Sequence, residues 1–100
     1  MNAKEFFDTL EARVDSAKTA GMNNSYVFDI DGVGTWKVDV RDGNVSVSEG
    51  ATDGDVTITT SEETFEKITS REQNATSAYM TGKLKVKGDM GAAMKLQKLF

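Results

Sequence analysis

The chain has 100 residues, of which 38% are hydrophobic and 28% charged, and this balance predicts a single soluble globular domain spanning residues 1–100. Its formal net charge of −4 makes the domain as a whole a poor ligand for nucleic acid. The absence of cysteine and histidine excludes disulfides, thiolate or imidazole metal sites and the most common general base, so we expect no metal, no cofactor and no catalytic residue.

No stretch of the sequence is suited to carry the chain into or across a membrane. No apolar run approaches the roughly 18 to 20 residues of a membrane-spanning helix. The N-terminal segment carries Glu5, Asp8 and Glu11 among its apolar residues, which is wrong for a signal peptide. We therefore expect a cytoplasmic protein.

Residues 3–19 predict an amphipathic helix. Phe6, Leu10, Val14 and Ala17 recur at the spacing of one helical face. Because the polar side of this helix is not basic, the apolar face favours a contact with the protein core over anchoring in a membrane.

Four strands follow, each with an apolar residue at every second position and polar residues between. The apolar positions are Tyr26, Phe28 and Ile30; Trp36, Val38 and Val40; Val45 and Val47; and Val56 and Ile58. This period predicts a sheet with one apolar and one wet face. Asp31-Gly32 and Asp42-Gly43 predict hairpin turns, which join the first three strands as an antiparallel meander. Residues 49–54 suit either a crossover or an edge loop.

The second half of the chain predicts three helices and one strand. The first helix is capped by Thr60 or Ser61 and places Phe65 and Ile68 on the same side. We then expect a helix over 73–81, a strand over 83–87 with Leu84 and Val86 facing inward, and a helix over 90–100 capped by Asp89. The order α-β-β-β-β-α-α-β-α predicts an α/β (α+β) fold, in which helices gather on the apolar face of one sheet.

Charge is distributed unevenly along the chain. Residues 83–100 hold five lysines and one acid, a net charge of +4, whereas residues 1–82 hold seven basic and fifteen acidic residues, a net charge of −8. Two interpretations stay open. Lysines on an edge strand discourage aggregation, and a basic end can also meet an anionic head group or membrane surface.

The predicted final helix is apolar around much of its circumference. One side carries Met90, Ala93, Met94 and Gln97, and the adjacent side carries Ala92, Leu96, Leu99 and Phe100. Such a helix is buried on two sides, pairs with another chain, or faces an internal ligand. Flexible methionine side chains suit a ligand of variable apolar shape, although an ordinary core helix has the same periodicity.

One hypothesis, weaker than those given below, is that the protein is an enzyme that uses a carboxylate. Asp29 or Asp39 would then act as the base on a small apolar substrate. Both residues lie on the sheet face that we predict to be wet, which disfavours catalysis by a carboxylate raised in pKa by burial.

The end of the sequence resembles the C-terminal signature of the sterol carrier protein 2 (SCP-2) family. The stretch is Met80-Thr-Gly-Lys-Leu-Lys-Val-Lys-Gly-Asp-Met-Gly-Ala-Ala-Met-Lys-Leu-Gln97, and Trp36 and the run Asp-Val-Thr-Ile-Thr-Thr-Ser-Glu-Glu at 55–63 are also similar to the family. The resemblance implies a five-stranded sheet with helices covering one face and enclosing an apolar tunnel. It further implies non-catalytic binding and intracellular transfer of fatty acids, fatty acyl-CoA, phospholipids or sterol-like lipids.

The resemblance also implies which residues contact the ligand. Met80, Leu84, Met90, Met94 and Leu99 fall where the family lines its tunnel, and Gln97 falls on a glutamine that would meet the polar end of the ligand. Phe65 and Ile68 are added from the face analysis of the covering helix. The expected partners are a lipid or fatty acyl ligand and, transiently, a membrane, for a monomer or weak dimer. The alternative is a protein-interaction module that uses the methionine-rich helix and carries no lipid.

Overall fold

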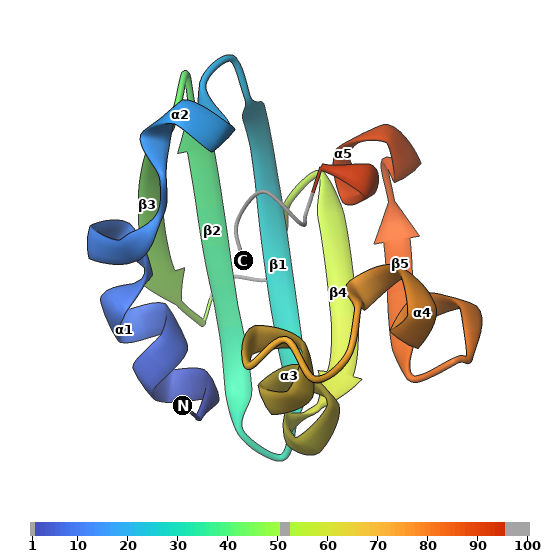
Figure 1. The fold of residues 1–100 in the computed structure, drawn as a ribbon. Helices are drawn as coiled ribbons and strands as arrows, with labels where there is room; N and C mark the ends of the chain where they lie inside the picture. Colours follow the sequence, from blue (N-terminus) through green and yellow to red (C-terminus); the bar gives the residue numbers. More distant parts are fainter. Residues whose placement is uncertain (1, 51–52, 96–100) are drawn as a thin grey trace.

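The computed structural model describes residues 2–50 and 53–95 (Figure 1). The elements are α1 (Ala3–Arg13), α2 (Ser16–Thr19), β1 (Asn23–Asp31), β2 (Gly34–Arg41), β3 (Asn44–Glu49), β4 (Val56–Ser61), α3 (Glu62–Thr69), α4 (Ala75–Met80), β5 (Leu84–Gly88) and α5 (Met90–Met94). The predicted α+β class, with one five-stranded sheet, is confirmed.

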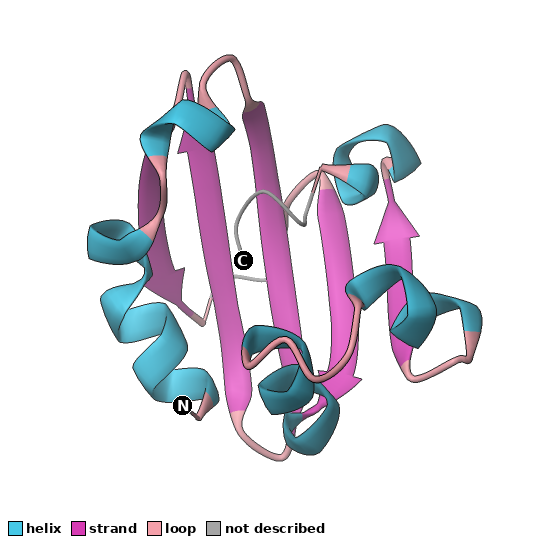
Figure 2. Cartoon of the chain, viewed as in Figure 1, coloured by secondary structure: helices cyan, strands magenta, loops and turns pink. Residues whose placement is uncertain are grey.

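The five strands lie in the order β3-β2-β1-β4-β5 (Figure 2). The first three form the antiparallel meander that the turn signals predicted. Strand β4 pairs in parallel with β1, so the connection between β3 and β4 is a crossover, which decides between the two readings of residues 49–54. Strand β5 pairs antiparallel with β4 and forms the second edge of the sheet.

The helices pack on the face of the sheet that carries the alternating apolar residues (Figure 2). The part of this face nearest α1 and α3 is filled by aromatic rings. Phe7 stacks on Trp36 with ring centroids 4.8 Å apart, and Phe65 meets Phe6 edge to face at 5.2 Å. Such pairs add about 0.5–1.5 kcal/mol each beyond the area that they bury, so they stabilise this half of the core further.

The predicted single helix over 3–19 is wrong, because the chain breaks it into two. Helix α1 ends at Arg13, and Val14 adopts an extended conformation with ψ of 137°. The carboxylate of Asp15 then accepts a hydrogen bond from the backbone N–H of Ala17, at 2.9 Å, and starts α2. A capping side chain offers the backbone an alternative to a continuous helix, and here that local preference outweighs the apolar periodicity.

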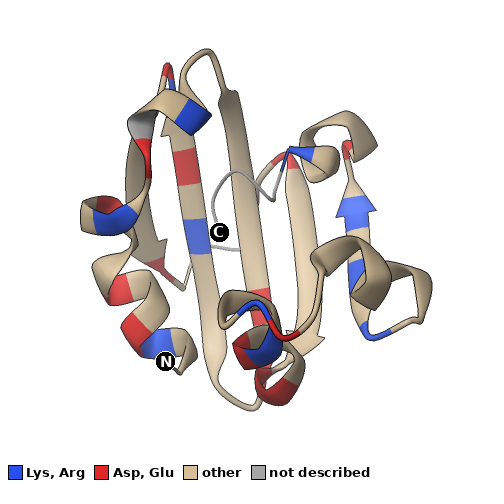
Figure 3. Cartoon of the chain, in the orientation of Figure 1, with Lys and Arg blue, Asp and Glu red and all other residues tan. Residues whose placement is uncertain are grey.

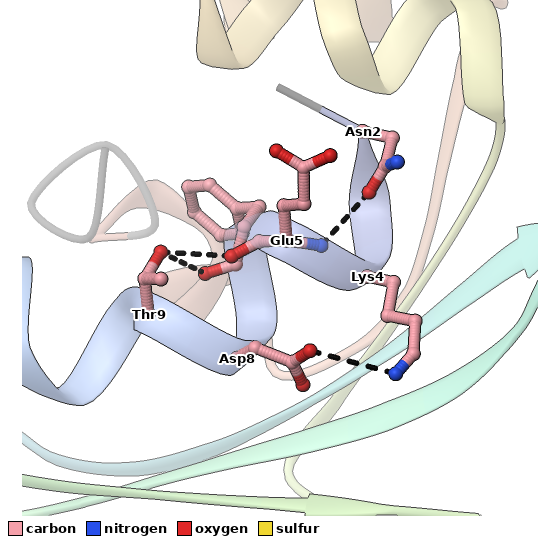
Figure 4. A network of polar contacts seen from close by, with 6 residues as sticks. Asn2, Lys4, Glu5, Asp8 and Thr9 are labelled. Atoms are coloured by element: carbon pink, nitrogen blue, oxygen red, sulfur yellow. Dashed lines mark hydrogen bonds and ion pairs between the residues drawn. The ribbon is translucent and has the colours of Figure 1, made fainter.

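Helix α1 is held at its start by local polar contacts (Figure 4). The Asn2 side chain accepts from the N–H of Glu5 at 2.8 Å, and Lys4 pairs with Asp8 at 3.6 Å. Further along the helix, the Glu11 carboxylate accepts the backbone N–H of Val47 at 2.7 Å. Because Val47 lies on edge strand β3, α1 supplies the acceptor that this edge lacks.

We predicted that the face opposite the helices is wet throughout. Part of this face is instead covered by the protein. Val27 is only 2% exposed and Ser25 is buried beside it. A Cβ atom at Gly54 would lie 3.1 Å from Val27, and Asp55 exchanges hydrogen bonds with the backbone and side chain of Ser25. The end of the crossover therefore lies against β1 on this face, which the alternation of residues in β1 could not reveal.

The later elements follow the sequence closely. Ser61 caps α3 as expected, the helix predicted over 73–81 is the shorter α4, and β5 matches the predicted fifth strand to within one residue. Asp89 caps α5, which ends at Met94 and so is shorter than the helix predicted over 90–100; residues 96–100 lie outside the described residues. Within the described ranges, every helix is too short or too polar to cross a bilayer.

Candidate functional site

The candidate site lies around β5, where two short helices complete the cover of the sheet. Helix α4 precedes β5 and α5 follows it, and both pack against it (Figure 1). Each helix contributes small residues to the core. Ala75 and Ala78 of α4 and Ala92 of α5 are buried, and Ala93 is partly buried against them.

Helix α4 begins at a strong cap and ends at a glycine. The Asn74 side chain accepts from the N–H of Thr76 at 2.7 Å, which satisfies one of the free donors of the first turn. Gly82 takes a positive φ of 79° after the last turn. With Ala75 and Ala78 facing the core, the side chains at the end of the helix, Tyr79 and Met80, face outward.

Helix α5 is placed by the junction that precedes it. Gly88 has a φ of 117°, and a Cβ atom there would collide with the carbonyl oxygen of Asp55. The next N–H, of Asp89, donates to that same carbonyl at 3.0 Å. The Asp89 carboxylate then accepts from the N–H groups of Gly91 and Ala92, at 2.9 and 3.2 Å, and starts the helix. Only glycine allows β5 and α5 to meet at this angle.

A buried tyrosine fastens α5 to the centre of the sheet. The hydroxyl of Tyr26, on β1, donates to the carbonyl oxygen of Ala92 at 2.6 Å. Burial, followed by the nearby carboxylates of Asp55 and Asp89, raises the pKa of Tyr26 from 10.0 to about 12. The phenol therefore stays protonated and keeps its donor through the neutral range.

The residues that we predicted to line a ligand tunnel divide into three groups. Phe65 and Ile68 of α3 and Leu84 of β5 are buried in the common core. Phe65 packs among the aromatic rings, 5.3 Å from the ring of Phe7. These three side chains lie on the helix-covered face, where the prediction requires them to be.

The three methionines are exposed instead. The exposed fraction is 78% for Met80, 46% for Met90 and 82% for Met94. Met80 ends α4, Met90 and Met94 are the first and last residues of α5, and none of the three joins the core. The last two predicted residues, Gln97 and Leu99, lie outside the described residues, so the predicted tunnel lining stays a prediction.

Two surface hollows are lined by described residues, one with polar and apolar lining in about equal parts and one largely polar. One, of about 250 Å³, is lined by Asp31, Thr59, Thr60, Ser61, Thr64, Gly82, Lys83 and Lys85. The other, of about 240 Å³, lies between α1 and the β2–β3 pair and is lined by Phe7, Asp8, Glu11, Trp36, Val47 and Glu49. None of the predicted ligand-binding residues in the described ranges lines either hollow.

The carboxylates do not assemble into a reactive or metal-binding group among the residues described. No cluster of three or more acidic side chains there could hold a metal ion. Asp39 forms an ion pair with Arg41 at 3.0 Å, and both Asp39 and Asp29 are half-buried on the sheet face opposite the helices. Neither residue lines either of the two hollows described above.

Sequence reasoning missed the role of Tyr26. The alternation in β1 identified Tyr26 as a core residue, but it gave no partner for its hydroxyl. A signal was present, because a buried tyrosine nearly always finds an acceptor. The acceptor is a backbone carbonyl 66 residues away, and no side-chain pattern identifies a backbone atom.

Comparison with known proteins gives a consistent picture of the chain. The model of the SCP-2 sterol transfer family matches residues 5–100. "Hydroxysteroid dehydrogenase-like protein 2" of Xenopus tropicalis is 34% identical over 100 residues, which cover 96% of this chain and 24% of that protein. "Peroxisomal multifunctional enzyme A" of Dictyostelium discoideum is 39% identical over 104 residues, covering 95% of this chain and 23% of that protein. The chain thus spans about a quarter of the length of these relatives.

Among solved structures, the palmitated SCP2L2 of Aedes aegypti has the same fold. Its TM-score is 0.80 at 24% identity, and the match covers 99% of this chain and 94% of that one. At this identity the likeness concerns the fold. It supports the five-stranded sheet and its helical cover.

Proposed function

Because the chain belongs to the SCP-2 sterol transfer family, we propose that it binds lipids and transfers them within the cell without catalysing a reaction. The ligand is a fatty acid, a fatty acyl-CoA or a sterol-like lipid. It occupies an apolar tunnel between the helix-covered face of the sheet and the segment that begins with α5. Phe65, Ile68 and Leu84 form the floor of this tunnel, and Met80, Met90, Met94, Gln97 and Leu99 close over the ligand.

The observation that supports the proposal most is the residue composition of α4 and α5, the two helices that pack against β5. Helices α4 and α5 face the core with alanines and keep their methionines outside. Alanines bury little apolar area, so these helices are held less firmly than α1 and α3. Methionines are flexible and adapt to irregular apolar shapes. A weakly held cover with adaptable side chains suits a site that opens to admit a lipid.

Burial of the alkyl chain supplies the affinity. Each methylene group removed from water contributes about 0.8 kcal/mol, so several buried methylenes offset the entropy lost on binding. Burial carries little directional information, and we therefore expect loose selectivity among alkyl chains. The palmitated state named for the Aedes aegypti relative supports an acyl chain as the first ligand to try.

The proposal is tested by looking for lipid in the protein as purified and by adding one. Mass spectrometry of extracts is expected to find co-purified lipid, and titration with a fluorescent fatty acid is expected to give uptake in the micromolar range. Absence of both would contradict the proposal.

A substitution locates the site. Met94→Lys is expected to abolish uptake, because a charged group at α5 opposes entry of an alkyl chain, while circular dichroism stays unchanged since Met94 is exposed. Val33→Lys is the matched control, because Val33 is also an exposed apolar residue but lies at the β1–β2 turn, far along the chain from α5. Unchanged uptake by Met94→Lys would remove α5 from the site.

The second candidate, a protein-interaction module without lipid cargo, is favoured by the same exposed methionines. It predicts a dimer that grows with concentration, or a partner that protects residues 90–100 from proteolysis. Sedimentation over a range of concentrations separates the two candidates, because lipid uptake by a monomer requires no such association.

A further inference from the structure

One side-chain oxygen on the sheet is buried without a hydrogen-bond partner. Among the residues that the structure describes, two side-chain oxygens are buried and accept no hydrogen bond, Asn24 Oδ1 and Asp39 Oδ1. Asp39 Oδ1 lies 3.0 Å from Arg41 Nε, and this ion pair offsets its charge. The amide oxygen of Asn24 is left with no partner of either kind in the described part of the chain. A buried acceptor without a donor lowers stability, so its presence calls for an explanation.

The amide of Asn24 lies on the helix-covered face of the sheet, near the start of β1. Asn24, Tyr26 and Phe28 are alternate residues of this strand, so their side chains point to the same face. Asn24 is in register with Val40 of β2. Tyr26, Phe28 and Val40 are buried in the core, whereas Asn24 itself is half-buried. A polar group thus ends a row of apolar ones, on the face along which the proposed tunnel runs.

The donors next to Asn24 are already in use. The N–H of Ser25 donates to the Asp55 carboxylate at 3.0 Å. The hydroxyl of Tyr26 donates to the carbonyl oxygen of Ala92 at 2.6 Å. Alternate residues of a strand are about 7 Å apart, so Asn24 lies one such step from the tyrosine that holds α5. In Figure 1, the start of β1 and α5 lie at the same end of the sheet.

We infer that Asn24 Oδ1 accepts a hydrogen bond from the hydroxyl group of a bound lipid, so that Asn24 favours lipids that carry an alcohol at their polar end. The inference rests on the proposed function and adds to it the residue that recognises the polar end of the ligand. An alcohol has an O–H donor, whereas an ester, an ether or an ionised carboxylate can only accept. Of these groups, the alcohol is the one that can bond to an amide oxygen.

The charge around Asn24 favours a neutral head group over a carboxylate. Strand β1 carries no charged residue before Asp29 (Figure 3). On the helix-covered face, β1 and β2 present no charged side chain at all. Burial raises the pKa of Tyr26 to about 12, and the carboxylates of Asp55 and Asp89 add to this shift. A carboxylate head group would meet the same negative charge, with no ammonium group on this face of the two strands to offset it.

The test compares two isomers, heptadecanol and hexadecyl methyl ether, as competitors for a bound fluorescent fatty acid. Both have the same carbon and oxygen content, and only the alcohol donates a hydrogen bond. The readout is the ratio of the concentrations at which the ether and the alcohol displace the fatty acid. One net hydrogen bond is worth about two- to tenfold in affinity, so Asn24→Leu is expected to lower this ratio by that factor relative to the wild type. The ratio cancels differences in hydration between the isomers, because these are the same for both proteins.

The matched control is Asn23→Leu, the same change at the neighbouring asparagine. Asn23 is exposed and points to the opposite face, and its Oδ1 accepts the N–H of Asp42 at 3.1 Å. This variant is expected to keep the wild-type ratio. In ligand-free protein, Asn24→Leu removes a buried acceptor that has no donor, whereas Asn23→Leu removes a bond that is formed. Urea denaturation is therefore expected to find Asn24→Leu the more stable of the two variants.

Two results would overturn the inference and leave the proposed function standing. One is an unchanged ratio in Asn24→Leu, or an equal fall in both variants. The other is a lower stability of Asn24→Leu than of Asn23→Leu, because it would show that the Asn24 oxygen is partnered inside the protein. Failure of the wild type to take up the fluorescent fatty acid would contradict the proposed function itself, and with it the inference.

Discussion

Tyr26 connects α5 to the centre of the sheet. Its hydroxyl reaches from β1 to the carbonyl oxygen of Ala92, so one hydrogen bond joins the central strand to the last described helix. Replacement by phenylalanine would leave the ring in the core and remove one of two donors to that carbonyl, which also accepts the backbone N–H of Lys95 at 3.0 Å. We expect a loss of about 0.5–1.5 kcal/mol in the free energy of unfolding, the net contribution of one hydrogen bond.

Tyr26 also makes the stability of the fold depend on pH in the alkaline range. The pKa of Tyr26 is raised from 10.0 to about 12, so the folded state prefers the protonated phenol. This contribution is fully present below pH 10 and is lost as the pH rises toward 12. Over that window we expect the free energy of unfolding of the wild type to fall by up to about 1.4 kcal/mol per pH unit relative to Tyr26→Phe.

Urea denaturation of both proteins over a series of alkaline pH values measures this difference. The lysines and the other ionisable groups are common to the two proteins, so their effects cancel in the comparison. Parallel stability curves for the wild type and Tyr26→Phe would show that the phenol is not coupled to folding.

At the scale of elements, the junction between β5 and α5 is the least tolerant point of the candidate site. Gly88→Ala is expected to destabilise the fold by at least about 2 kcal/mol, because it combines a positive φ with a collision against the Asp55 carbonyl. The free energy of unfolding from urea denaturation measures the loss. Gly91→Ala, three residues later and inside α5, is the control and is expected to be neutral or slightly stabilising. Equal effects of the two substitutions would contradict the role of Gly88.

Strands were easier to predict than helices in this chain. Alternation identified every strand and placed Phe28, Trp36 and Ile58 on one face, because the period of two is the same wherever a strand lies in the sheet. The break after Arg13 was missed because the apolar periodicity favours one continuous helix, whereas Asp15 favours the start of a new one. The sequence alone does not show which preference is stronger.

The candidate site was predicted less completely than the fold. Family resemblance named residues on α4, β5 and α5, and the buried position of Leu84 agrees with the expected inward face of β5. The outward position of Met80 and Met94 could not be read from spacing, since a helix of five or six residues has too few turns to define a face. The acceptor of the Tyr26 hydroxyl could not be identified from the sequence, because every residue presents the same backbone carbonyl.

At the scale of the whole molecule, the core is asymmetric. Aromatic rings fill the part beneath α1 and α3, whereas α4 and α5 contribute alanines. We expect amide hydrogens of α4 and α5 to exchange faster than those of β1 and β2, because elements with little buried area open at lower free energy. Binding of a fatty acid is expected to slow exchange in α4 and α5 selectively. Uniform exchange across the domain, or slowing confined to α1, would contradict this distribution of stability.

The bond between Tyr26 and Ala92 has a consequence for altering the protein. The Tyr26 hydroxyl donates to a backbone carbonyl oxygen, and every residue type carries such an oxygen. The outward residues of α5 can therefore be exchanged without changing the acceptor that docks the helix. On the proposed function, a library varied at Met90 and Met94, with Gly88, Asp89 and Tyr26 unchanged, is expected to differ in ligand preference while the fold stays constant.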